Sequence, residues 1–130
     1  MIMKKWIFLL FAVASLSMSC ATDQKVKVLD VEEYVWSVQH DQEAVVLDVR
    51  TEKEFKQGHI EGAQLLDFMD QTLFDEGLEK LDKNKTYYIY CRSGRRSNMA
   101  AVRMQEQGFK VFDLKGGMNA WREAQKPVVQ

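Results

Sequence analysis

Residues 44–49 form a continuous apolar run, broken by one carboxylate near its end, and this run most constrains the fold. A continuous run, unlike an alternating one, is typical of a strand that is covered on both faces. A second β-favouring run, residues 86–90, leads directly into Cys91. Between and around these runs lie segments with helical spacing. Strands that alternate with helices predict an α/β fold with a largely parallel sheet.

The helical segments have recognisable starts and stops. Asp30 with Glu33, and Thr51 with Glu54, have the spacing of capping boxes at helix starts. Val31, Tyr34, Val35 and Val38 follow the first cap as an apolar stripe, and Trp36 falls off it. The other expected strands are residues 25–29, 62–66 and 110–112. The other expected helices are residues 75–81, a helix from the Cys91 loop to about Gln107, and a terminal helix that carries Trp121. On the helix that ends near Gln107, the side chains expected to face inward are Met99, Val102 and Ala100/Met104.

The first nineteen residues have the order of a secretory signal peptide. Lys4 and Lys5 precede an apolar run over residues 6–13, which is too short to span a bilayer, and small polar residues follow. The alternative is a buried terminal strand or helix, but two lysines before a wholly apolar block are poor patterning for a globular domain. We therefore expect a signal peptide at 1–19, a tether at 20–25 and one folded domain at 26–130.

Cys20 lies at the expected cleavage site and resembles the lipid-attachment cysteine of bacterial lipoproteins. The usual pattern has Leu three residues before the cysteine, where this chain has Ser17, so cleavage without lipidation is the alternative. Lipidation predicts a protein anchored to a membrane of the bacterial cell envelope, facing the periplasm or the surface. Cys91 would then be the only thiol of the mature protein, which excludes an internal disulfide and a cysteine-based metal site.

The charge balance argues against nucleic acid as the main partner. The chain has 18 Lys and Arg against 19 Asp and Glu, whereas phosphate binding needs a clustered cationic excess.

Cys91 ends a predicted strand and begins a short glycine-containing loop before a helix. Ligand sites in parallel sheets lie at the carboxyl ends of strands, where loop amides and a helix N-terminus present positive partial charge. This charge favours a thiolate, the nucleophilic form of cysteine. The loop residues support the same interpretation. Positive charge comes from Arg92, Arg95 and Arg96, and Gly94 permits a bend of the backbone. The hydroxyl groups of Ser93 and Ser97 can donate hydrogen bonds to an anion. Alone, a buried apolar cysteine or a solvated arginine cluster would be the simpler interpretation.

Two chemistries use a cysteine on such a loop. Cysteine phosphatases place an arginine after five intervening residues, and Ser97 occupies that position here, with Arg96 one residue early. The loop is therefore one residue short for a tetrahedral phosphate, and it suits an anion whose outer sulfur projects towards the cysteine, such as thiosulfate.

Three segments of the chain resemble the single-domain rhodaneses. Residues 91–97 resemble the active loop of that family, residues 48–63 its N-terminal signature, and residues 114–121 its C-terminal signature. The resemblance covers about residues 26–128. It implies a five-stranded, mostly parallel sheet flanked by helices on both faces.

The resemblance also implies a reaction. Cys91 would take sulfur from thiosulfate as a persulfide, cradled by residues 92–97, and would pass it to cyanide or a thiol without a metal or organic cofactor. The alternative is a sulfur carrier or redox partner module, in which the same Cys91 is loaded by another protein.

The remaining signature residues have structural explanations. Thr51 and Glu54 form a cap, Arg50 can pair with Glu54 or with Asp48, and Asp48 can hydrogen-bond a neighbouring loop. His59 is a turn residue in the family, and transfer of sulfur to a thiolate needs no general base. Trp121 is expected in the core, and the role of Lys115 stays open.

Overall fold

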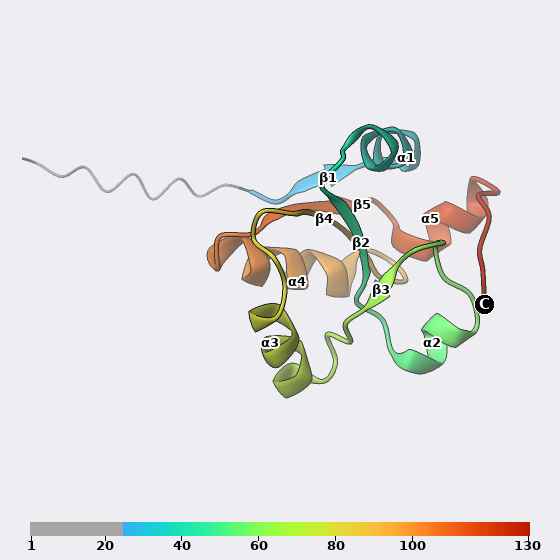
Figure 1. Cartoon of the computed structure of the whole chain (residues 1–130). Coiled ribbons are helices and arrows are strands. Elements are labelled where there is room, and N and C mark those ends of the chain that lie inside the picture. Colours follow the sequence, from blue (N-terminus) through green and yellow to red (C-terminus); the bar gives the residue numbers. More distant parts are fainter. Residues whose placement is uncertain (1–24) are drawn as a thin grey trace, which may run out of the picture.

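The computed structural model describes residues 25–130, which form a single sheet with helices on both faces (Figure 1). The predicted signal peptide, the lipid-attachment residue Cys20 and most of the tether lie outside the described residues. The strands are β1 (Lys27–Leu29), β2 (Ala44–Asp48), β3 (Gln64–Leu65), β4 (Thr86–Tyr90) and β5 (Lys110–Leu114). The helices are α1 (Val31–His40), α2 (Glu52–Lys56), α3 (Gln71–Glu79), α4 (Arg95–Glu106) and α5 (Gly117–Glu123).

The five strands are all parallel, in the order β1-β5-β4-β2-β3. The two predicted apolar runs, β2 and β4, pair at the middle of the sheet, with Asp48 opposite Tyr90. Because parallel strands end at the same edge, residues that follow β2 and β4 lie close together. The predicted α/β fold is confirmed, and the sheet brings Asp48 and Cys91 to one edge.

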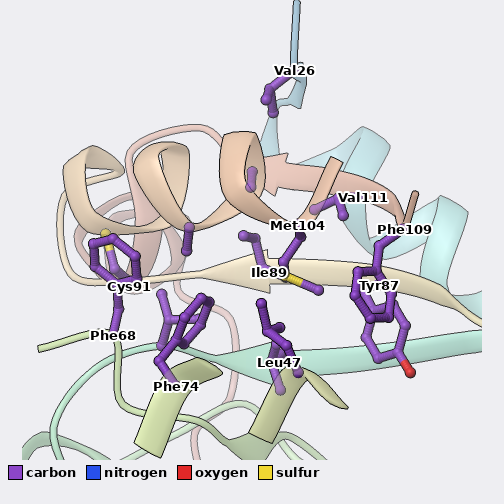
Figure 2. Packing of buried hydrophobic residues seen from close by; sticks show 14 residues of the cluster. Val26, Leu47, Phe68, Phe74, Tyr87, Ile89, Cys91, Met104, Phe109 and Val111 are labelled. Carbon is purple, nitrogen blue, oxygen red and sulfur yellow. The ribbon is translucent and has the colours of Figure 1, made fainter. Parts of the chain in front are cut away.

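Each face of the sheet has its own hydrophobic core. Leu47 and Ile89 point to the face covered by α3 and α4, where Phe74 and Met104 pack against them (Figure 2). Tyr34 of α1, Trp121 of α5 and residues from the opposite sides of the same strands form the second core. The prediction that residues 44–49 are covered on both sides is therefore confirmed, as is the buried position of Trp121.

Both predicted capping boxes are present. At the start of α1, the side chain of Asp30 accepts from Glu33 N and that of Glu33 accepts from Asp30 N. Thr51 and Glu54 make the same reciprocal pair at the start of α2. Each pair satisfies two backbone N–H groups that the helix itself leaves free.

Two predictions about helices were wrong in detail. Helix α3 begins at Gln71 rather than at residue 75, because Asp70 caps it by accepting a hydrogen bond from Leu73 N. On α4, Met99 and Val102 are exposed rather than inward. The side that packs on the sheet carries mostly small residues, namely Ser97, Ala100 and Ala101, together with Met104. Small side chains let the helix approach the sheet closely, and the larger ones remain outside.

The surface of α1 includes Trp36, which is 62% exposed and stacks on His40. Within residues 25–130 no helix combines the length and the apolar character needed to cross a bilayer.

Candidate active site

Cys91 follows β4 directly, and its sulfur is held by the loop that leads into α4. The backbone N–H of Gly94 and the hydroxyl of Ser97 lie 3.1 and 3.3 Å from Cys91 Sγ and donate to it. Gly94 has φ = +100°, a left-handed conformation that side chains with a Cβ resist, and it is the residue at which the chain turns into α4. Two donors directed at one sulfur stabilise negative charge on it.

The side chain of Cys91 is buried. It has no exposed surface and belongs to the core beneath α4, at the end where Phe68 lies (Figure 2). Arg92, Ser93 and Arg95 are exposed around it. Any molecule that reacts with this sulfur must therefore reach into the loop, because the cysteine does not project from the surface.

The start of α5 supports the loop from the other side. Met118 N donates to Cys91 O at 2.8 Å, and Asn119 N donates to Arg92 O at 3.0 Å. A Cβ on Gly117 would lie 2.4 Å from Cys91 O, so this close approach requires glycine. The C-terminal signature segment, residues 114–121, thus fixes the backbone of the active loop.

Arg96 forms a two-point ion pair with Glu54 of α2. Its Nη1 and Nη2 atoms each lie 2.8 Å from a different oxygen of Glu54. This pairing lowers the pKa of Glu54 to about 2. The sequence placed Arg96 among the anion-binding residues and gave Glu54 a role as a cap or as a partner of Arg50. Arg96 and Glu54 are brought together across 42 positions of sequence, which no local pattern could reveal.

The phosphatase alternative loses support from the same pair. Arg96 is the residue nearest to the phosphate-binding position of that class, and both of its terminal nitrogens are committed to a carboxylate.

Arg50 pairs with Asp48, which decides between the two partners left open by the sequence. Arg50 Nη2 lies 2.7 Å from Asp48 Oδ2, and it also donates to Gly58 O at 2.8 Å. The hydroxyl of Tyr90 donates to the same Asp48 oxygen at 2.6 Å. Burial raises the pKa of Tyr90, with the Asp48 charge acting in the same direction. This buried network joins the ends of β2 and β4 next to the Cys91 loop.

A family model described as "Rhodanese-like domain" matches residues 23–124. The chain belongs to the rhodanese-like family. The putative sulfurtransferase YtwF of Bacillus subtilis is 39% identical over 90 residues, which cover 69% of this chain and 84% of that protein. The thiosulfate sulfurtransferase GlpE of Coxiella burnetii is 34% identical over 88 residues, which cover 67% of this chain and 79% of that protein.

 The two relatives therefore align over most of their own length.

The chain also resembles longer and structurally characterised proteins. The putative sulfur carrier protein YrkF of Bacillus subtilis is 35% identical over 94 residues, and this chain spans about half (49%) of its length. The crystal structure of a rhodanese-related protein from Thermoplasma volcanium superposes with a TM-score of 0.71 at 25% identity, covering 79% of this chain and 97% of that one. The relatives' names agree on sulfur transfer in general, and they differ on whether the protein is an enzyme or a carrier.

One buried carboxyl group of this rhodanese-like chain was missed by the sequence reasoning. Asp113 of β5 is 2% exposed, and its Oδ1 atom has no hydrogen-bond partner. Burial raises the pKa of Asp113 to about 6, while the side chains of Ser97 and Asn98 at the start of α4 act in the opposite direction. The only signal in the sequence was a single carboxylate inside a β-favouring run.

His59 has the structural role expected of a turn residue. Its ring stacks on Phe55 with centroids 3.6 Å apart, and Nδ1 lies 2.9 Å from Phe55 O. Its backbone forms a bridge with Val129. Within residues 25–130 no cluster of three or more His, Cys, Asp or Glu side chains is arranged to hold a metal ion.

Proposed function

We propose that this protein is a sulfurtransferase that carries sulfane sulfur as a persulfide on Cys91, with thiosulfate as the donor. The observation that carries the proposal is the pair of donors, Gly94 N and Ser97 Oγ, directed at Cys91 Sγ in a loop of the family's type. Both donors would stabilise the thiolate before the reaction and the persulfide after it. The exposed Arg92, Ser93 and Arg95 surround the entrance and would attract and orient an anionic donor.

The reaction has two steps, each a displacement at sulfur. The Cys91 thiolate attacks the outer sulfur of thiosulfate, a bond from Sγ to that sulfur forms, and the S–S bond of thiosulfate breaks with its electron pair leaving on sulfite. Cyanide or a thiolate then attacks the outer sulfur of the persulfide. The bond to Sγ breaks, and its electron pair regenerates the Cys91 thiolate.

A thiocyanate assay tests the enzymatic proposal. The purified protein, supplied with thiosulfate and cyanide, should form thiocyanate, and Cys91→Ser should form none. Arg103→Gln, which changes a residue of α4 paired with Asp75, controls for changes in the helix alone. Equal thiocyanate formation by the wild type and Cys91→Ser would refute the role of Cys91.

A sulfur-carrier function is the second candidate. It is favoured by the similarity to YrkF, which is named as a sulfur carrier protein. A carrier would be persulfidated completely by a partner protein yet show negligible turnover with free thiosulfate. Comparing the rates of persulfide formation from thiosulfate and from a persulfidated donor protein separates the two functions.

We also propose that residues 1–19 are removed on export and that Cys20 is lipidated, which would place the domain in the bacterial cell envelope. The support is the sequence pattern described above. Cys20→Ala should move the protein from the membrane to the soluble fraction after cell breakage, and an unchanged distribution would contradict the anchor.

A further inference from the structure

A small polar cavity lies beside the Cys91 loop, on the side of α2 and α5. It has a volume of about 200 Å³ and is lined by Met118 and by the polar residues Arg50, Glu54, Gln57, Arg92, Asn119 and Arg122. We call it the arginine pocket. Its walls come from the segment after β2, from α2, from the active loop and from α5. It is smaller than pockets that enclose a drug-sized ligand, so it suits one charged end of a larger molecule.

The arginine pocket carries an excess of positive charge. The charge of Arg50 is balanced by Asp48, and that of Glu54 is balanced by Arg96. Arg92 and Arg122 form no salt bridge with any residue in the described part of the chain. Two unbalanced guanidinium groups at one cavity repel each other, and a bound anion would relieve that repulsion.

Backbone hydrogen bonds hold the segments that form the pocket next to the sulfur of Cys91. Arg92 follows Cys91 in the chain, and the hydrogen bonds from Met118 N and Asn119 N fix α5 against Cys91 and Arg92. Arg122 lies over Gly58, whose carbonyl oxygen accepts from Arg50. The backbone segments that carry Arg92 and Arg122 are therefore tied to the backbone that carries Cys91.

The pocket lies to one side of the proposed binding site of the donor and shares Arg92 with it. The donors to Cys91 Sγ, Gly94 and Ser97, belong to the α4 side of the loop and do not line the pocket. In thiosulfate the outer sulfur is bonded directly to the charged group, so that charge must stay close to Sγ. A thiol whose carboxylates are several bonds from its sulfur can instead place them in a separate site.

We propose that the arginine pocket binds the carboxylate groups of a thiol acceptor that removes sulfur from Cys91. This inference rests on the proposed function. The acceptor thiolate attacks the outer sulfur of the Cys91 persulfide, forming an acceptor persulfide, and the electron pair of the broken bond returns to Cys91. Arg92 and Arg122 pair with the carboxylates and orient the thiol, and Arg122 takes no part in loading the persulfide.

The test compares two acceptors on the full-length protein loaded with sulfur from thiosulfate. The rate of loss of the Cys91 persulfide is measured with mercaptosuccinate, which has two carboxylates, and with 2-mercaptoethanol, which has none. The wild type should prefer mercaptosuccinate, and Arg122→Gln should raise the KM for mercaptosuccinate about tenfold relative to that for 2-mercaptoethanol. Lys80→Gln, which removes one positive charge outside the pocket, should keep the wild-type preference.

A second measurement uses succinate, which has the carboxylates and lacks the thiol. It should inhibit the reaction of mercaptosuccinate competitively in the wild type and much less in Arg122→Gln. The inference alone would be overturned if the persulfide formed normally but the wild type showed no preference between the two acceptors. Equal inhibition by succinate in the wild type and in Arg122→Gln would also overturn it. Failure of the wild type to form any persulfide would instead overturn the proposed function.

Discussion

At the scale of single residues, the reactivity proposed for Cys91 depends on few hydrogen-bond donors. Only Gly94 N and Ser97 Oγ donate to its sulfur among the described residues, and the first of these is a backbone group that substitution cannot remove. Ser97 is therefore the side chain through which the stabilisation of the sulfur anion can be tested.

Ser97→Ala should slow persulfide formation from thiosulfate by about tenfold to a hundredfold, since a hydrogen bond to a charged group contributes about 1.5–3 kcal/mol. Mass spectrometry of samples quenched at successive times gives the rate of persulfide formation. Ser37→Ala, on α1 across the sheet, is the control and should react like the wild type. A normal rate in Ser97→Ala would show that this hydroxyl does not assist the sulfur.

Asp113 links stability to pH. Its pKa is raised to about 6 in the folded protein, so the folded state holds the proton more tightly than the unfolded chain does. Its contribution is therefore most favourable below about pH 4 and is lost as the pH rises through 6. Asp113→Asn should stabilise the protein by about 2 kcal/mol at pH 8 and much less at pH 4. Urea unfolding at both pH values measures this, and a gain that does not depend on pH would contradict it.

Residue partnerships within a few positions could be predicted, and distant ones could not. The capping pairs Asp30–Glu33 and Thr51–Glu54 follow from three-residue spacing. The pairing of Arg50 with Asp48 was one of two local possibilities. The pairing of Glu54 with Arg96 needs the sheet to bring α2 to the Cys91 loop, so only the three-dimensional fold reveals it.

At the scale of elements, α2 and α5 each hold the active loop. Helix α2 does so through the Glu54–Arg96 ion pair, and α5 does so through its first backbone N–H groups. These two contacts explain why the three signature segments, which are distant in sequence, form one site.

Glu54→Gln tests the contact made by α2. Glutamine can still cap the helix, so the substitution mainly removes the charge that pairs with Arg96. Because the pKa of Glu54 is lowered to about 2, its stabilising effect is complete above about pH 4.5 and is lost as the pH falls through 2. The variant should be about 2 kcal/mol less stable than the wild type at pH 7, and the difference should shrink in acid. A difference that persists unchanged near pH 2 would argue against the ion pair.

Gly117→Ala tests the contact made by α5. The added Cβ would meet Cys91 O at 2.4 Å, so the loop or the helix must move, and we expect a loss of about 2–4 kcal/mol in the free energy of unfolding. Gly62→Ala is the matched control, because Gly62 also has a positive φ but its Cβ would meet nothing within 4 Å. Equal losses in the two variants would show that the close approach at Gly117 is unimportant.

Helix starts were predictable where two signals agreed, namely a capping residue and a glutamate three positions later. Helices α1 and α2 begin at caps followed by glutamate three residues later. Helix α3 begins at Gln71 after the cap Asp70, and the third residue after Asp70 is Leu73, so the reciprocal pattern is missing and the start was placed too late. On α4, the buried side was misjudged because small residues, rather than the largest apolar ones, face the sheet.

At the scale of the whole molecule, the parallel sheet follows from the composition of its central strands. A run such as residues 44–49 can only be buried if both faces are covered, and the two cores show that they are. The parallel order then places every strand end, including that of β4, at one edge. The position of the candidate site was thus predictable, whereas the arginine pocket depends on the packing of α2 and α5 against the loop.

The central claim is that Cys91 accepts a sulfur atom inside this loop. Intact mass spectrometry of the protein, before and after incubation with thiosulfate, tests it most directly. The wild type should gain the mass of one sulfur atom, located at Cys91 by peptide analysis and removed by cyanide, and Cys91→Ser should gain nothing. A folded wild-type protein that gains no sulfur from thiosulfate or from a persulfide donor would contradict the account.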